Sequence, residues 1–218
     1  MKKLLTLMLA CAAILVMGIA AAAVRADGTD DNSTSQTVAT PPCTGTQNDD
    51  NEANDSRARA ADDGHGTDAT DNHQGSSGDD SFDGQGGDDS ESGGDGNDNL
   101  SGDQGDDDLC GDQGDDDLHG GSGNDVLKGG SGDDKLVGGS GSDTEQGDSG
   151  SDDLEGDSGA DHLNGGKGND TITAGAGNDV VNSRDGQRDV VNCGRGHDVV
   201  KADRKDKVSS NCESVKRS

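Results

Sequence analysis

The sequence GDQGDDDLCGDQGDDDLH, residues 102–119, is almost the same nine residues written twice. Each copy places three adjacent aspartates before one leucine, at 106–108 and again at 115–117. Because like charges at this spacing repel, a folded chain must either neutralise the three aspartates or place them in different environments. The sequence around this stretch indicates which solution applies.

The nine-residue period extends through twelve consecutive units, from Gly75 to Asn182. The fourth place is Gly and the sixth is Asp in all twelve units, and the first place is Gly in eleven. The eighth place is apolar in ten units, with Glu91 and Glu145 as the exceptions. The chain has no Trp or Tyr, one Phe, 38 Gly and a net charge of −29, a composition typical of disordered segments. Twelve units in register argue against that class.

The residue types predict how each unit folds. The Gly- and Asp-rich places one to six form a tight turn, and places seven to nine form a short strand with its eighth side chain inward. Two units bring the chain back after eighteen residues, so the sixth-place aspartates stack in columns about 4.8 Å apart. Carboxylate and carbonyl oxygens suit Ca²⁺ better than Mg²⁺ in such turns, and we expect folding to require the metal.

The three aspartates of the opening stretch therefore take different roles. Asp107 and Asp116 occupy the sixth place and are the candidate ligands. The aspartates before them occupy the fifth place, where other units have Asn, Ser or Ala, so their carboxylates are dispensable for the metal. Those after them point outward from the strand.

The units GGDGNDNLS (93–101), GGSGNDVLK (120–128) and GGKGNDTIT (165–173) resemble the nonapeptide GGxGxDxUx of RTX (hemolysin-type) calcium-binding repeats. The resemblance covers residues 75–182. It implies an all-β fold, a right-handed parallel β-roll, whose turns bind Ca²⁺ as cofactor. It further implies up to about ten ions, each held between a turn and the turn two units on. The implied metal ligands are Asp80, Asp89, Asp98, Asp107, Asp116, Asp125, Asp134, Asp143, Asp152, Asp161, Asp170 and Asp179.

Some units depart from this pattern. The second place is Asp at 103, 112, 148 and 157. Asp tolerates left-handed geometry, so we expect these turns to survive. Glu145 occupies an inward place in mid-array, and we expect a kink or an outward turn there because a buried charge is costly. Glu91 lies nearer the end of the array, where we expect fraying to lower that cost.

Charge and hydropathy divide the chain into four parts. Residues 1–26 form a signal peptide with a preferred cut before Asp27; a cut after Ala23, a lipoprotein cut before Cys11 and an uncleaved anchor are alternatives. Residues 27–74 form an acidic disordered linker, in which HGTDATD (65–71) imitates half a repeat out of phase. Residues 75–182 are the twelve repeats. Residues 183–218, which carry 9 basic and 6 acidic residues, form a degenerate repeat and a cap.

Four cysteines remain after the signal peptide: Cys43, Cys110, Cys193 and Cys212. An exported chain can form disulfides, and the spacing gives no zinc motif. Cys193 and Cys212 are candidates for a bridge within the cap, while the pairing of Cys43 and Cys110 stays open. The C-terminal part, residues 183–218, contains CGRGHDVVK (193–201), a modified thirteenth unit with Asp198 at its sixth place.

The sequence predicts a secreted, extracellular bacterial protein that binds calcium and is not an enzyme. Strand alternation places Cys110 and His119 on opposite sheets, which argues against a catalytic pair. The acidity argues against nucleic acid as a partner and, after signal cleavage, against membrane. Cell-surface or matrix components are further candidate partners. The alternatives are a cell-surface adhesin or matrix protein, or the RTX portion of a larger exported toxin or enzyme.

Overall fold

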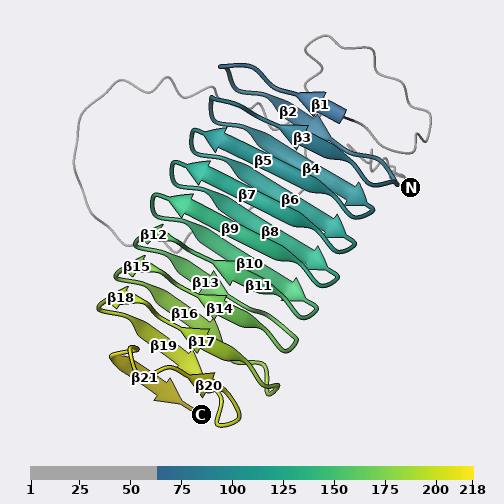
Figure 1. Cartoon of the computed structure of the whole chain (residues 1–218). Coiled ribbons are helices and arrows are strands. Elements are labelled where there is room, and N and C mark those ends of the chain that lie inside the picture. The colour runs from purple at the N-terminus through teal and green to yellow at the C-terminus, as the bar shows by residue number, and fades with distance from the viewer. Residues whose placement is uncertain (1–62) are drawn as a thin grey trace, which may run out of the picture. The chain divides into compact units, whose positions relative to one another are not determined.

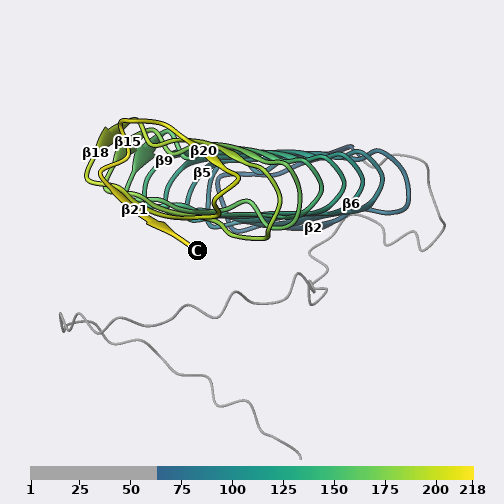
Figure 2. The same cartoon turned by 90° about the horizontal axis from the view of Figure 1, so that it is seen from below.

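The computed structural model describes residues 63–218, which form an all-β parallel solenoid (Figure 1). The chain alternates between two facing sheets, so odd and even repeats build opposite sides of each coil. In the view from below, the coils lie over one another as flattened loops, with β2 and β6 on one long side and β5 and β9 on the other (Figure 2). The predicted fold class is confirmed. Within residues 63–218, no helix could cross a membrane.

We call the two sheets A and B. The strands of sheet A, in spatial order, are β1 (Asp63–His65), β3 (Ser81–Asp83), β5 (Asn99–Gln104), β7 (Asp117–Ser122), β9 (Lys135–Ser140), β11 (Asp153–Glu155), β14 (Thr171–Thr173), β17 (Val190–Asn192) and β20 (Lys207–Val208). Three two-residue strands lie beside this row: β12 (Ser158–Gly159), β15 (Ala176–Gly177) and β18 (Arg195–Gly196). The strands of sheet B are β2 (Asn72–Gln74), β4 (Ser90–Asp95), β6 (Asp108–Gln113), β8 (Val126–Ser131), β10 (Thr144–Ser149), β13 (His162–Asn164), β16 (Val180–Ser183), β19 (Val199–Ala202) and β21 (Ser214–Arg217).

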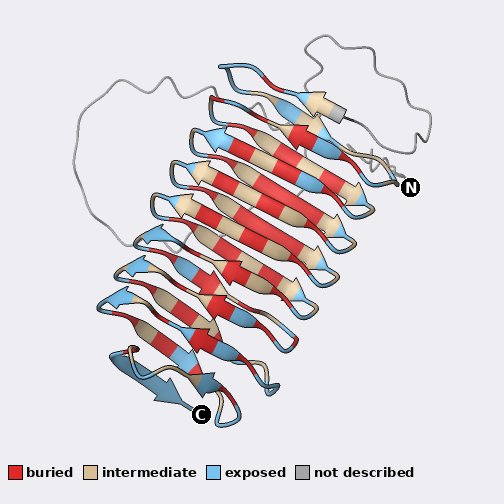
Figure 3. Cartoon of the chain, in the orientation of Figure 1, coloured by how far each residue is buried: buried red, intermediate tan, exposed pale blue. Residues whose placement is uncertain are grey.

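The strand register repeats every eighteen residues, as the two-unit coil predicts. Leu100 pairs with Leu118 in sheet A, and Leu109 pairs with Leu127 in sheet B. The inward eighth places of both sheets thus form rows between the sheets, visible as buried bands across the strands (Figure 3). Every apolar eighth-place side chain of the twelve units is at most 3% exposed. This narrow apolar filling is the core of the solenoid.

The longest strands exceed the three residues expected from the sequence. Strands β4 to β10 each have six residues, because places one to three of the next unit continue the strand. Backbone hydrogen bonds join these added residues to neighbouring coils; Gly96 N, for example, donates to Gln113 O at 2.8 Å. The true turn is therefore shorter, at places four to six.

The invariant fourth-place Gly allows neighbouring turns to approach closely. A Cβ on Gly105, whose φ is +134°, would lie 1.6 Å from the carbonyl oxygen of Gly87 in the preceding coil. Any side chain there would push the coils apart. By contrast, the second place tolerates Asp as predicted: Asp103, Asp112, Asp148 and Asp157 all adopt φ values between 60° and 73°.

The solenoid begins earlier than the sequence predicted. β1 and β2 lie within the stretch 27–74 interpreted as linker, and they pair with β3 and β4. Residues 66–74 are in phase with the array, contrary to our interpretation of HGTDATD. The unit was missed because its fourth place is Ala69 and its eighth is His73. The predicted signal peptide and the linker up to residue 62 lie outside the described residues.

Both inward glutamates are buried in regular strands. Glu145 is 1% exposed and pairs in register with Leu127 and Leu163, so the predicted kink or outward turn at this position is wrong. Its Oε1 accepts a hydrogen bond from Gly138 N at 3.1 Å, and burial raises its pKa well above the usual value. Glu91 does not lie in a frayed end: its Oε1 is 3.5 Å from Nδ1 of His73, whose ring stacks on Phe82.

The C-terminal residues 183–218 continue both sheets, ending in the edge strands β20 and β21. The predicted disulfide between Cys193 and Cys212 is present, and both cysteines belong to the core. Basic side chains of this part bind main-chain oxygens; Arg217 Nη1 donates to Asp203 O at 2.7 Å. Cys110 is also disulfide-bonded, and Cys43 lies outside the described residues.

Replacing Gly105 with Ala should lower the free energy of unfolding by at least about 2 kcal/mol, because strain at positive φ adds to the clash with Gly87. Gly186 is the matched control: its φ is +88°, and a Cβ added there would meet nothing within 4 Å. Gly186→Ala should cost only the strain of about 1 kcal/mol. Urea unfolding in saturating calcium measures both; equal losses would contradict the close approach of the coils.

Candidate metal-binding turns

The sixth-place aspartates lie in two columns along the turns, one for each set of alternate units. All twelve predicted residues, Asp80 to Asp179, are buried, with 0–3% exposure. From Asp89 to Asp179, each carboxylate is linked to the coil before it; the Oδ1 of Asp116, for example, accepts a hydrogen bond from Asp98 N at 2.8 Å. The next link follows the same rule, with Asp134 Oδ1 accepting from Asp116 N at 2.9 Å. The columns are thus built of carboxylates that bridge neighbouring coils.

The second carboxylate oxygen distinguishes these turns from ordinary structural turns. In eleven of the twelve aspartates, Oδ2 is buried and has no hydrogen-bond partner within the described chain. Asp80, at the start of the array, differs, because its Oδ2 accepts from Ser76 N at 2.7 Å. A buried charged oxygen without a partner is destabilising by several kcal/mol, whereas a bound cation would satisfy it. The donor set therefore fits an oxygen-ligated metal.

In the eleven units that have it, the first-place Gly leaves room beside the Oδ2 of the sixth-place aspartate. A Cβ on Gly93 would lie 2.1 Å from Asp98 Oδ2, and one on Gly111 would lie 2.2 Å from Asp116 Oδ2. Each turn thus forms a small cradle of backbone around one carboxylate oxygen. In residues 63–218, no three His, Cys, Asp or Glu side chains cluster as a ready-made metal site. The remaining ligands would be backbone carbonyls, which Ca²⁺ accepts readily.

Burial and repulsion by neighbouring carboxylates both raise the pKa values of the sixth-place aspartates from Asp89 to Asp179. Burial is the larger cause at Asp116, and the charges of Asp134 and Asp98 add to it, raising its pKa to about 7. The same causes raise the pKa of Asp125 and Asp152 to about 7 and that of Asp107 to about 6. Without a cation, such columns would hold protons near neutral pH.

The fifth place forms a second ladder that the sequence analysis did not foresee. Asp106 Oδ1 accepts a hydrogen bond from Asn124 N at 2.7 Å, and Asp88 Oδ1 accepts from Asp106 N at 3.0 Å. This ladder runs in the opposite direction to that of the sixth place, since each side chain binds the following coil. Nine of the twelve fifth places are Asp or Asn, and this enrichment could have revealed the second ladder from the sequence.

The sixth-place ladder extends past both predicted ends. Asp89 Oδ1 accepts from Asp71 N, and the tail continues the ladder through Asp189, Asp198 and Asp206. Asp189 and Asp206 were missed because the tail has coil spacings of 19 and 17 residues instead of eighteen. The recurring DVVN at 179–182 and 189–192 could have revealed Asp189.

The residues considered as catalytic candidates lie apart. Cys110 is on β6 of sheet B and His119 is on β7 of sheet A, as alternation predicted. His119 Nε2 lies 2.9 Å from Asp117 Oδ1 on its own strand.

Eleven of the twelve repeats carry one buried carboxylate oxygen without a partner in the described chain, which is the construction of a metal-binding repeat array. The family model for the RTX calcium-binding nonapeptide repeat matches the chain in four copies, at residues 65–90, 92–118, 111–145 and 146–181. The matches cover more than half of the chain, which therefore belongs to this family of calcium-binding repeats. A search of curated proteins found no match.

The raised pKa values predict how the calcium-free protein responds to pH. Protons stabilise a fold whose Asp pKa values lie above the unfolded value of about 3.9. This stabilisation is complete below pH about 4 and is lost as the pH rises through the folded values of about 6 to 7. Circular dichroism of desalted, calcium-free protein should show β-structure decreasing over this range. Calcium should remove the loss; a β signal that increases with pH without calcium would contradict the burial of these groups.

Proposed function

We propose that this protein is a secreted, non-catalytic calcium-binding protein that folds into its β-roll as it binds several Ca²⁺ ions. The observation that carries the proposal is the column of buried Oδ2 atoms, each without a partner in the described chain. Membership of the RTX family supports calcium as the ion.

The proposed ligands are the twelve sixth-place aspartates, Asp80 to Asp179, together with turn carbonyls. Because each carboxylate bridges two coils, twelve units give up to about ten sites. Asp71, Asp189 and Asp198 lie in the same ladder and are candidates for further sites. Affinities of about 10⁻⁴–10⁻³ M would suit extracellular calcium and would leave the chain unfolded where calcium is scarce.

Export is supported by two features. The apolar stretch after Lys2 and Lys3 is typical of a signal peptide, and the Cys193–Cys212 disulfide suits an oxidising compartment. We also propose that the protein is not an enzyme. The carboxylates with raised pKa values recur at the same place in successive turns, as in a structural array, and are not gathered in one site.

Calcium should fold the mature chain. Far-UV circular dichroism of residues 27–218 should gain β signal with millimolar Ca²⁺ and lose it after addition of a chelator, because the ion replaces protons in the carboxylate columns. Equal concentrations of Mg²⁺ should be less effective, since Mg²⁺ prefers a smaller octahedral shell. A spectrum that calcium leaves unchanged would overturn the proposal.

Single substitutions should separate ligand aspartates from neighbours. Asp116→Asn keeps an oxygen to accept the Asp98 N–H but removes the charge, so titration calorimetry should show a loss of about one or two ions. Asp117→Asn is the matched control, because that side chain is 45% exposed on the outer face. Its stoichiometry should equal that of the unmodified chain; equal losses in the two variants would mean that the sixth place does not supply the ligands.

A further inference from the structure

The outer face of sheet B carries a surface that is unlike the rest of this acidic chain. From β8 to β21, the seventh and ninth places flank a buried or inward eighth place, and all of them except the buried Lys128 are partly or fully exposed. None of these twelve outward positions is acidic, although the chain contains 46 Asp and Glu residues. The corresponding face of sheet A carries Asp117, Asp153 and Glu155.

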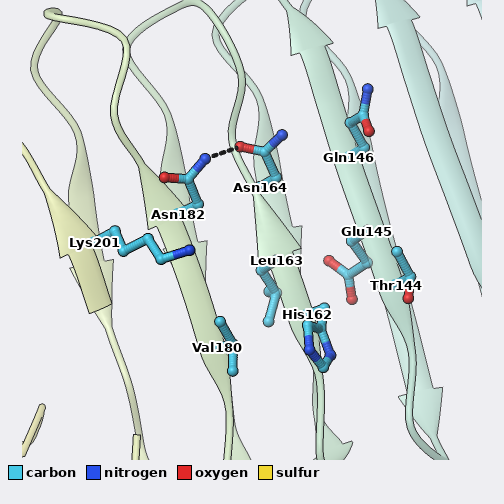
Figure 4. Close-up of a pocket in the computed structure, with 9 residues that line it drawn as sticks. All are labelled: Thr144, Glu145, Gln146, His162, Leu163, Asn164, Val180, Asn182 and Lys201. Carbon is cyan, nitrogen blue, oxygen red and sulfur yellow. Dashed lines mark hydrogen bonds between the residues drawn. The ribbon is translucent and has the colours of Figure 1, made fainter. Parts of the chain in front are cut away.

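A groove of about 290 Å³ lies on this face, across β10, β13, β16 and β19 (Figure 4). One row of its lining comes from the seventh places Thr144, His162 and Val180 and another from ninth places, and the eighth-place residues Glu145 and Leu163 complete it. These are side chains from four strands that are consecutive in the sheet but eighteen or nineteen residues apart in sequence. Its size suits a small ring or a short segment of a polymer rather than a folded partner.

The ninth-place row supplies ordered hydrogen-bonding groups. Asn182 Nδ2 donates to Asn164 Oδ1 at 2.8 Å, which holds the two amides in line along the groove (Figure 4). Their remaining amide atoms offer one donor and one acceptor, a combination that suits hydroxyl groups. The Thr144 hydroxyl lies in the opposite row, and Val180 offers an apolar surface between polar groups.

The groove carries a positively charged side chain at one end. Lys201 is exposed at one end and has no ion-pair partner within the described residues. His162 is exposed in the seventh-place row. Acidic groups also lie near: Glu145 is part of the lining, and Asp148 accepts a hydrogen bond from Gln146 Nε2. The sixth-place aspartates Asp143, Asp161 and Asp179 directly precede β10, β13 and β16, and in the proposed calcium-bound state the ions would compensate their charge. An uncompensated cation beside an amide row is complementary to a ligand bearing hydroxyls and an anionic group.

We propose that this groove binds an anionic saccharide, with its acidic group at Lys201 and its hydroxyls on Asn164 and Asn182. This inference rests on the proposed function, because the four strands come together only in the folded array. The shared chemistry could come from a carboxylated or a sulfated sugar chain. Such a ligand would give the calcium-folded protein a means of attachment to an extracellular polymer.

Titration calorimetry of the mature chain in saturating calcium tests the proposal. Three probes distinguish the sources of charge: a uronic-acid trisaccharide, a sulfated trisaccharide and an uncharged trisaccharide, each equilibrated with the same calcium concentration. One or both charged probes should bind at least about tenfold more tightly than the uncharged one, the effect of one charge-assisted contact. Equal binding of all three, or binding of none at millimolar concentration, would overturn the proposal.

Matched variants locate the site. Lys201→Gln should weaken binding of the charged probe about tenfold, whereas Lys207→Gln, an exposed lysine on sheet A, should not. Asn182→Ala should weaken binding, whereas Asn192→Ala, which breaks the similar Asn211–Asn192 contact on sheet A, should not. Equal effects within either pair would overturn the site.

Circular dichroism of every variant keeps the two proposals separate. A protein that folds with calcium and does not bind saccharide contradicts the groove alone. One that does not fold with calcium contradicts the proposed function.

Discussion

The structure depends on one constraint: the carboxylate columns must be neutralised before the coils can stack. Each coil adds one buried aspartate to each of the two columns, and in all but Asp80 one oxygen is bound to backbone and the other has no partner in the described chain. The apolar contribution is small, since each unit buries one side chain of moderate size at its eighth place. Neutralisation of the columns, by protons or by metal, therefore decides whether the stacked state is stable.

The two opposed ladders explain why the fifth and sixth places tolerate different residues. At the fifth place the side chain needs only an oxygen to accept the N–H of the following coil, so Asn serves as well as Asp. Ser142 occupies a fifth place, and its N–H still donates to the side chain of Asn124 in the preceding coil. A fifth-place residue can therefore be replaced without losing the hydrogen bond that its own N–H makes to the coil before. At the sixth place the second oxygen faces the cradle, and there an amide would not supply the charge. The invariant Asp and the variable fifth place follow from this difference.

The sequence was sufficient to predict the features that every unit repeats. The eighteen-residue register, the inward Leu rows and the buried sixth-place aspartates all follow from positions that can be recognised within one unit. The first coil could not be predicted in this way, because its stability comes from contacts between units. His73 is acceptable inward only because it stacks on Phe82 and lies beside Glu91, and Gly64 leaves room for the Phe82 ring. Taken one at a time, His73, Glu91 and Gly64 depart from the repeat pattern. In contact with one another and with Phe82, they pack compatibly.

Glu145 shows why a regular array can bury an acidic residue that an isolated strand would turn toward solvent. Its strand is bonded in register on both sides, to β8 and β13, and turning Glu145 outward would shift or break both pairings. A one-residue slip would also turn every neighbouring side chain of that strand to the wrong face. Keeping the carboxyl neutral costs less: from an ordinary pKa of 4.5, protonation at pH 7 requires about 3 kcal/mol. Several buried backbone groups without partners would cost more than this, at about 1–3 kcal/mol each. An acidic residue in the core can therefore either break its strand pairings or take up a proton. In a strand that is paired on both sides, taking up a proton costs less free energy.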